Sequence, residues 1–288
     1  MEYLASAGVL ISIYVILAAS YNLIIGYGGL NTIAHPIFFA LGAYGAALLG
    51  INTGLPAVIC VLVGVAVAVV ASIVLALTTL RVSGDYLLIA SLGFQLGLLQ
   101  LVNNLEFMGG PAGLSNIPMT LAGSGRGWLY LLICGVLALL VVLLVQRSMS
   151  GPFGRAVRAM RDDEVACAAL GRGLFSMKIV IFAVGCGAAG LAGGLYAYYF
   201  QYISPEQFNV AQSATILTMV VLGGIGTIWG PVIGAFVLVA LPQAITFLQL
   251  PSSLVGPLQG LLFTSLVILF LFLRPYGLVG RHVKGAVH

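Results

Sequence analysis

Two long stretches of this chain carry almost no charge. No Asp, Glu, Lys or Arg lies between Glu2 and Arg81, and Glu206 is the only charged residue between Lys178 and Arg274. A helix needs about 20 apolar residues to cross a bilayer, so each stretch is long enough for several crossings. Over the whole chain 6% of the residues are charged, whereas about a quarter are charged in an average soluble domain. The sequence therefore predicts an integral membrane protein.

The apolar segments have the pattern of helices. In a bilayer every backbone N–H and C=O must be paired inside the protein, so a crossing segment is a helix or a strand of a closed barrel. Barrel strands alternate apolar and polar residues, but segments such as residues 57–77 are continuously apolar. We therefore expect an all-α, polytopic transmembrane helical bundle with about eight or nine spans. The candidate spans are residues 3–25, 33–50, 56–80, 86–102, 127–146, 179–200, 206–223, 231–249 and 257–273.

The distribution of basic residues predicts the orientation. Residues 147–178 contain 6 of the 11 Lys and Arg residues, and loops rich in these residues stay in the cytoplasm. Counting spans from this loop places the N-terminus outside and the C-terminus in the cytoplasm. The loops 103–126 and 201–205 are then predicted to face outward. Ser204 followed by Pro205 is typical of a helix start, so a helix is expected to begin there.

One nine-residue pattern occurs twice. Residues 28–36 read GGLNTIAHP and residues 223–231 read GGIGTIWGP, and both copies lie between apolar segments. Gly- and Pro-interrupted helices at matching positions of an internal repeat are typical of transporters. Two helix turns that reuse the same turn residues would give the same pattern. Of these two interpretations we favour a duplicated half, with its interrupted segments near a conduction pathway.

Motifs for catalysis and nucleotide binding are absent from the sequence. No GxxxxGK[ST] loop, HExxH or GxSxG occurs, and the four cysteines have no metal-ligand spacing. The acidic residues map to loops or to the ends of spans, whereas proton-coupled carriers usually hold titratable groups inside the spans. We therefore expect a chain that is not an enzyme, with no catalytic residue, metal site, cofactor or nucleic-acid partner. Its energy source is expected to lie on another subunit.

The basic loop 147–178 is predicted to form two short helices joined at an acidic cap. Phe153, Val157 and Met160 recur at helical spacing and give the first helix an apolar face, and an acid at 162–163 can cap the second helix. An exposed apolar face must be covered, either by the lipid surface or by a partner protein. Anionic headgroups would repel the acidic residues beside the arginines. The sequence therefore favours a partner protein.

Several segments of the chain resemble one family of membrane proteins. They are FGRAVRAMRDDEVACAALG (153–171), GLAGGLYAYYFQYISPEQF (190–208), MVVLGGIGTIWGPVIGA (219–235), and earlier YNLIIGYGGLNTIAHPIFFALGAYGAALL (21–49), LRVSGDYLLIASLGF (80–94) and MGGPAGL (108–114). Together they resemble the permease family of branched-chain amino acid ATP-binding-cassette (ABC) importers, specifically the LivM-type subunit. The similarity runs from about residue 15 to about residue 275.

The resemblance implies a single permease domain over residues 1–288 in the inner membrane of a prokaryote. Such a subunit pairs with a LivH-type permease, two cytoplasmic ATPase subunits that bind ATP, and an extracytoplasmic solute-binding protein. The loop 147–178 would then be the coupling segment that docks into the ATPases. The residues expected to carry this coupling are Arg155, Arg158, Arg161, Asp162, Asp163 and Glu164.

Polar side chains inside the spans are the candidates for a translocation pathway, although hydrogen bonds between helices would explain the same residues. They are Asn22, Asn31, Thr32, His35, Ser91, Gln95, Gln212, Thr215 and Thr218. The resemblance covers importers of branched-chain and other hydrophobic amino acids and also of urea or short amides, so the substrate stays open among these. A stand-alone channel or secondary carrier, and a structural membrane scaffold, are the alternatives from other classes.

Overall fold

The computed structural model describes residues 2–79, 85–119, 125–246, 264–265 and 277–279. Within these residues the regular secondary structure is helical, apart from one isolated bridge between Leu114 and Ile203. The predicted all-α, polytopic bundle is confirmed.

Among the described residues, six helices are long and apolar enough to cross a membrane. They are α1 (Glu2–Asn22), which continues as the π-helical turn η1 (Leu23–Tyr27), then α2 (His35–Thr53), α3 (Ala57–Thr79), α4 (Asp85–Asn104), α5 (Arg126–Ser150) and α8 (Leu174–Phe200). Two shorter apolar helices follow, α9 (Val210–Gly223) and α10 (Gly230–Thr246). These helices match eight of the predicted spans. The remaining predicted span, residues 257–273, lies outside the described residues except for 264–265.

The helix expected to begin at Ser204 is a separate short one. Pro205–Phe208 form a 3-10 helix, η4, in which Ser204 and Gln207 make a reciprocal capping box. The α-helix of this span begins later, at Val210, where the Asn209 side chain accepts a hydrogen bond of 3.1 Å from the backbone N–H of Gln212. The predicted span 206–223 is therefore divided into η4 and α9, because Asn209 caps a second helix after the one that Ser204 caps.

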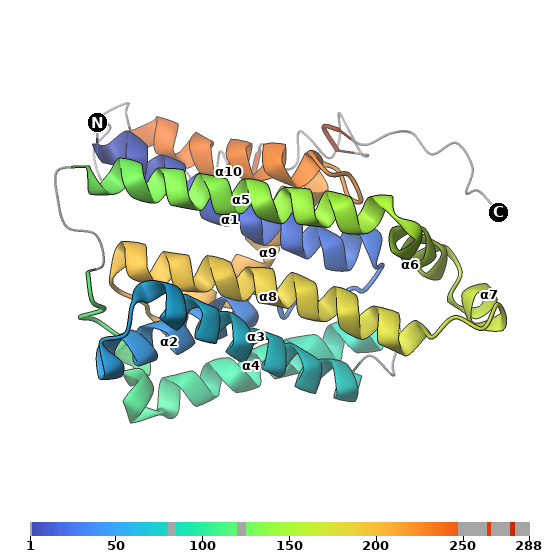
Figure 1. Cartoon of the computed structure of the whole chain (residues 1–288), viewed down its shortest axis with the longest axis horizontal. Helices are drawn as coiled ribbons and strands as arrows, with labels where there is room; N and C mark the ends of the chain where they lie inside the picture. The colour runs from blue at the N-terminus through green and yellow to red at the C-terminus, as the bar shows by residue number, and fades with distance from the viewer. Residues whose placement is uncertain (1, 80–84, 120–124, 247–263, 266–276, 280–288) are drawn as a thin grey trace.

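The helices form two layers, and α1 is the most buried of the membrane-crossing helices. In Figure 1, α1, α5 and α10 lie in the upper layer, and α2, α3, α4 and α8 lie in the lower one. Ile13, Ile16 and Leu17 of α1 are fully buried. By contrast, α3 and α5 expose large apolar side chains such as Val58 and Leu132, as expected for helices that face lipid or another membrane subunit.

The two ends of the bundle differ. The short helices α6 (Pro152–Asp162) and α7 (Glu164–Ala169) lie beyond one end, and the N-terminus of α1 lies at the other (Figure 1). We call the end that carries residues 147–178 the basic end, and the other the opposite end. The loops around Leu114 and Ile203 meet through two backbone hydrogen bonds of 2.8 and 3.1 Å. Both therefore lie on one side of the bundle, as the sequence predicts.

Glycines allow α2, α3 and α8 to approach closely. A methyl group added to Gly42 of α2 would collide with the backbone of Gly190 in α8, and one added to Gly64 of α3 would collide with the carbonyl of Gly42. Lipid tails are as apolar as Leu, so helices in a bilayer associate through close packing rather than through hydrophobic burial. This three-helix contact therefore holds the lower layer together.

Candidate functional site

The two copies of the nine-residue pattern form two equivalent breaks between helices. The first copy connects η1 to α2, and the second connects α9 to α10. In each, the proline is the second residue of the helix that follows: Pro36 in α2 and Pro231 in α10. Gly29 and Gly226 have positive φ angles of 66° and 73°, which glycine adopts without steric cost.

Consecutive residues of α1 hold the two breaks at matching positions. Thr32 and Thr227 occupy the same place in the two copies. The Tyr21 hydroxyl donates a hydrogen bond of 2.5 Å to the carbonyl of Thr32, and the Asn22 side-chain amide donates one of 2.7 Å to the carbonyl of Thr227. Asn22 also accepts a hydrogen bond of 2.8 Å from the backbone N–H of Gly226. The breaks are thus anchored to the same turn of α1.

The first break runs inside the bundle. His35 is buried, and its Nε2 lies 3.0 Å from the Ser20 hydroxyl of α1. The backbone N–H of Ile33 donates a hydrogen bond of 3.0 Å to the hydroxyl of Ser91 in α4. Polar backbone at membrane depth is tolerated only where protein groups satisfy it. Three of the residues predicted for a pathway, Thr32, His35 and Ser91, therefore meet here.

The other predicted pathway residues form separate groups. The Gln95 side chain accepts a hydrogen bond of 3.1 Å from the Ser213 hydroxyl, and Gln212 donates one of 2.7 Å to the Tyr14 hydroxyl. Thr215 and Thr218 each bond to a carbonyl one turn back in α9, and Asn31 is exposed. The structure does not bring the nine residues together in one place, and a pathway through them stays a prediction.

The basic segment forms the two predicted helices. α6 ends at Asp162, and the Asp163 side chain then accepts a hydrogen bond of 2.9 Å from the backbone N–H of Ala166, which caps α7. Gly171 follows α7 with a φ of 74°. Because α5 continues to Ser150 and α8 begins at Leu174, the ends of the predicted loop belong to the long helices.

The apolar face of α6 is covered by this chain itself. Val157 and Met160 are 0% and 3% exposed, and Phe153 is half-buried. They pack with α5 and η1. The prediction that a partner protein covers this face is therefore wrong. Helical spacing shows that one face must be buried, but it does not show which surface buries it.

The exposed apolar side chains of the segment lie on and just after α7. Val165 is 79% exposed and Leu170 is 81% exposed. α7 is fixed to the bundle by an ion pair between Glu164 and the buried Lys178 of α8. α7 and the residue after it therefore present two apolar side chains beyond the basic end of the bundle.

The six residues predicted for coupling divide into two sets. Asp163 caps α7, and Glu164 pairs with Lys178, as described above. Arg161 donates a hydrogen bond of 2.8 Å to the carbonyl of Gly26 and forms an ion pair of 3.0 Å with Asp162. Arg155 is exposed and Arg158 is half-buried. Four of the six thus make contacts within this chain. The sequence did not reveal these partners, because the bond of Arg161 is to a backbone carbonyl and Lys178 was predicted to lie in the loop rather than in α8.

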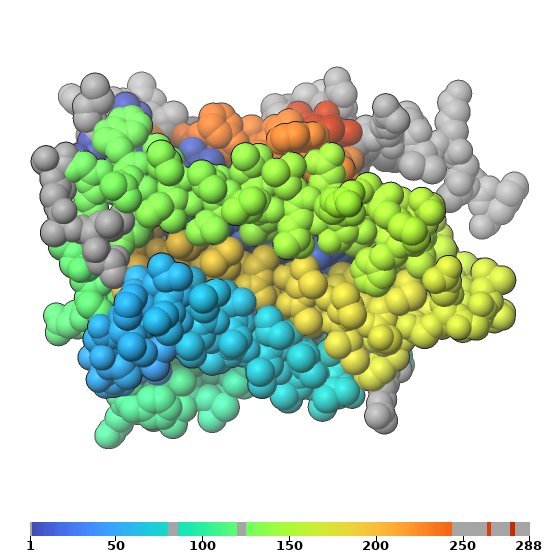
Figure 2. Space-filling model, in the orientation of Figure 1, coloured from blue at the N-terminus to red at the C-terminus, as the bar shows by residue number. Residues whose placement is uncertain are grey.

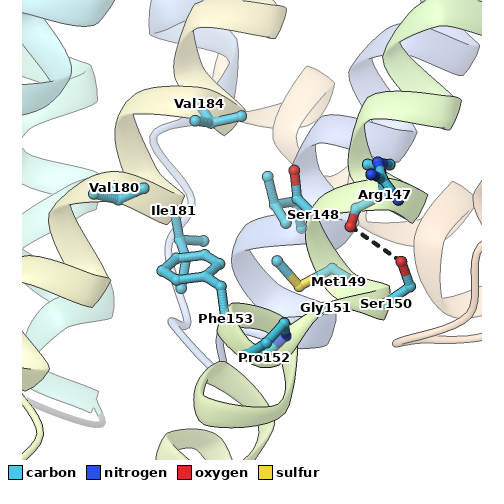
Figure 3. A pocket seen from close by; sticks show the side chains of 11 residues that line it. Arg147, Ser148, Met149, Ser150, Gly151, Pro152, Phe153, Val180, Ile181 and Val184 are labelled. Atoms are coloured by element: carbon cyan, nitrogen blue, oxygen red, sulfur yellow. Dashed lines mark hydrogen bonds between the residues drawn. The ribbon is translucent and has the colours of Figure 1, made fainter.

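Two hollows lie between α5 and α8. One, with a volume of about 580 Å³, is at the basic end between the α5–α6 corner and the Val180–Val184 turn of α8 (Figure 3). The other, of about 450 Å³, is apolar and opens between α3, α5 and α8, with α1 at its bottom (Figure 2). Because the first hollow lies between Phe153 of α6 and the Val180–Val184 turn of α8, the start of α6 is not tightly packed against α8.

These features together define a class of protein. A bundle of apolar helices interrupted by a repeated Gly/Pro break, with a basic helix pair beyond one end, is the architecture of a polytopic membrane permease.

Comparison with known proteins identifies the family. Residues 3–271 match the family described as the permease component of the branched-chain amino acid transport system. The chain is 34% identical to the high-affinity branched-chain amino acid transport permease LivM of Escherichia coli K12, over 93% of this chain and 68% of that protein. It belongs to this permease family, among the LivM-type members.

More distant relatives are also similar. The chain is 32% identical to the probable branched-chain amino acid transport permease LivM of Methanocaldococcus jannaschii, over 70% of this chain and 62% of that protein. It is 28% identical to LsrC, the autoinducer 2 import permease of Yersinia pestis, over 66% of this chain and 55% of that protein. No solved structure matches the chain.

Proposed function

We propose that this chain is the transmembrane permease subunit of an ABC importer for branched-chain or other hydrophobic amino acids. The LivM proteins support this substrate class, because the similarity to the Escherichia coli protein extends over 93% of this chain. The autoinducer 2 permease is similar over a smaller share, 66%. Urea and short amides remain the alternative substrates.

The proposed complex contains four kinds of subunit. This chain forms one permease domain, a LivH-type permease completes the membrane part, two ATPases bind at the basic end, and a solute-binding protein delivers the substrate to the opposite end. The basic end is the cytoplasmic one, because it holds the Lys- and Arg-rich segment. ATP is bound by the ATPases, and the sequence of this chain contains no P-loop.

The observation that carries the coupling proposal is the exposure of α7. Val165 on α7 and Leu170 just after it are exposed, and Glu164 at the start of α7 pairs with Lys178 of α8. Arg155 of α6 is exposed at the same end. Apolar anchors surrounded by charged residues are the usual composition of a protein interface. We therefore assign ATPase docking to Val165, Leu170 and Arg155, and we call these three residues the docking surface.

Co-purification of the ATPases with this chain tests the docking surface. We expect the double variant Val165→Glu, Leu170→Glu to lower the recovered ATPases by about tenfold or more, since it would bury two unpaired carboxylates at the contact. Phe107→Glu is the matched control, because Phe107 is 63% exposed but belongs to η2 (Glu106–Met108) at the opposite end. Unchanged recovery with the double variant would refute the assignment.

The substrate is tested by uptake into vesicles that contain the complete importer. Leucine uptake should be inhibited by unlabelled isoleucine and valine, and urea or acetamide should not compete. Competition by the amides alone would assign the transporter to the alternative substrates.

A further inference from the structure

The Arg161 side chain bonds to the end of η1 and lies close to both breaks of the bundle. Its Nη1 donates a hydrogen bond of 2.8 Å to the carbonyl of Gly26, at the end of η1. A side chain on Gly29, in the first break, would collide with the Arg161 stem. A Cβ atom on Gly226, in the second break, would lie 3.3 Å from Arg161 Nη1. One guanidinium from α6 thus reaches two segments that are about 200 positions apart in the sequence.

The contact with Gly26 has a clear electrostatic cause. The last carbonyls of a helix have no partner within the helix and carry partial negative charge. An arginine is therefore attracted to the end of η1. Its remaining donors, Nε and Nη2, bond to the Asp162 carboxylate at 3.1 and 3.0 Å, which fixes the plane of the guanidinium. This division of donors needs the planar fork of arginine, which lysine does not have.

The second break is also joined to α1 and to the end of η1 at this level. Asn22 bonds to the backbone of both Gly226 and Thr227. A Cβ atom on Gly26 would collide with the Asn22 side chain and lie 2.6 Å from the Gly226 nitrogen. The end of η1 and the second break are therefore in direct contact, and Arg161 lies against both.

We propose that Arg161 is a positioning residue through which α6 moves the two breaks together, rather than a residue that binds the ATPases. The proposal rests on the proposed function and adds to it that the docked ATPases displace α6. The hollow of about 580 Å³ beside Phe153 gives α6 room to move relative to α8. The contacts of Arg161 then pass this displacement to the ends of η1 and α9 and leave the rest of the bundle in place.

Arg161→Gln and Arg161→Lys in the complete importer test the proposal. We expect both variants to bind the ATPases and hydrolyse ATP as the wild type does. The amount of solute transported per ATP should fall by about tenfold or more, because hydrogen bonds made by charged groups are the strong ones. Arg147→Gln is the matched control: it removes one exposed arginine at the same end, and its transport per ATP should not change.

The outcomes separate this inference from the proposed function. Unchanged transport per ATP in both Arg161 variants would overturn the inference alone. Loss of ATPase binding in Arg161→Gln would also overturn it, because Arg161 would then belong to the docking surface. If the wild-type chain did not bind the ATPases, both the proposed function and this inference would be refuted.

A distance measurement in the otherwise unchanged protein covers the case in which the variants do not fold. Spin labels are placed on the exposed positions Ala159 of α6 and Ile225 of the second break. A second pair joins Ala159 to the exposed Val184 of α8. Between the nucleotide-free and ATP-bound importer, the first distance should stay constant and the second should change. A change in the first distance would contradict the proposal.

Discussion

The side-chain amide of Asn22 donates a hydrogen bond of 2.7 Å to the carbonyl of Thr227, 205 positions further along the chain. The same side chain accepts a bond from Gly226, so both polar groups of the amide are used. Since the preceding residue, Tyr21, makes the equivalent bond to Thr32, one turn of α1 fixes both interrupted segments. The internal repeat is therefore a feature of the packing as well as of the sequence.

Replacing Asn22 should destabilise the fold. Asn22→Leu has a similar volume but leaves two backbone groups of the second break unpaired, so we expect the free energy of unfolding to fall by about 2 kcal/mol or more. Ser12→Ala is the control: the Ser12 hydroxyl bonds to a carbonyl of its own helix, and its loss should cost about 0.5 kcal/mol or less. Denaturation of the purified protein in detergent measures both. Equal losses would show that Asn22 does not anchor the break.

Close packing of α2 on α8 predicts a large effect of one methyl group. Gly42→Ala would place its Cβ against the backbone of Gly190, which cannot rotate away. We expect a loss of about 1–3 kcal/mol, as for other overpacked sites. Gly97→Ala in α4 is the control, because a Cβ there meets no atom within 4 Å. The midpoint temperature of thermal unfolding should fall for Gly42→Ala and should not change for Gly97→Ala. The reverse order would refute this account of the packing.

The cap of α7 should be sensitive to loss of a side-chain acceptor. Asp163→Ala removes the bond to Ala166 and should destabilise α7 by about 1 kcal/mol, whereas Asp163→Asn keeps an acceptor and should cost little. Hydrogen exchange of residues 164–169 measures the difference. Faster exchange in both variants would mean that the negative charge stabilises α7 more than the cap does.

The ion pair between Glu164 and Lys178 should show coupling in a double-mutant cycle. Lys178 is almost fully buried, and the Glu164 side chain is 41% exposed. Glu164→Gln leaves the Lys178 charge unpaired and should cost about 1–2 kcal/mol, less than in a fully buried pair. Glu164→Gln with Lys178→Met should recover most of this loss, as thermal unfolding would show. An additive double variant would indicate that the two side chains act independently.

Much of the fold could be predicted from the sequence. Lipid restricts a crossing segment to a helix, and the long apolar runs in the sequence show where these helices lie. Eight predicted spans coincide with helices. Pro36 and Pro231 marked the helix starts after the two breaks, since proline is tolerated in the first turn. The division of the span at 206–223 was missed because Ser204 and Asn209 are both good caps.

The contacts of the basic segment could not be predicted in the same way. The spacing of Val157 and Met160 indicates a buried face, but it does not show that α5, the preceding helix, and η1, more than 120 positions earlier, bury it. Arg161 has the exposed, charged neighbours of a docking residue, yet its guanidinium bonds to the carbonyl of Gly26. Every residue has a backbone carbonyl, so the residue types in the sequence could not show which carbonyl Arg161 binds.

Solute accumulation in reconstituted vesicles tests the central claim, that hydrolysis by separate ATPases drives transport through this chain. Vesicles with this chain, its partner permease, the ATPases and the binding protein should concentrate leucine only when ATP is supplied on the ATPase side. Vesicles with this chain alone should show no accumulation, with or without ATP. Accumulation against a gradient by this chain alone would contradict the account.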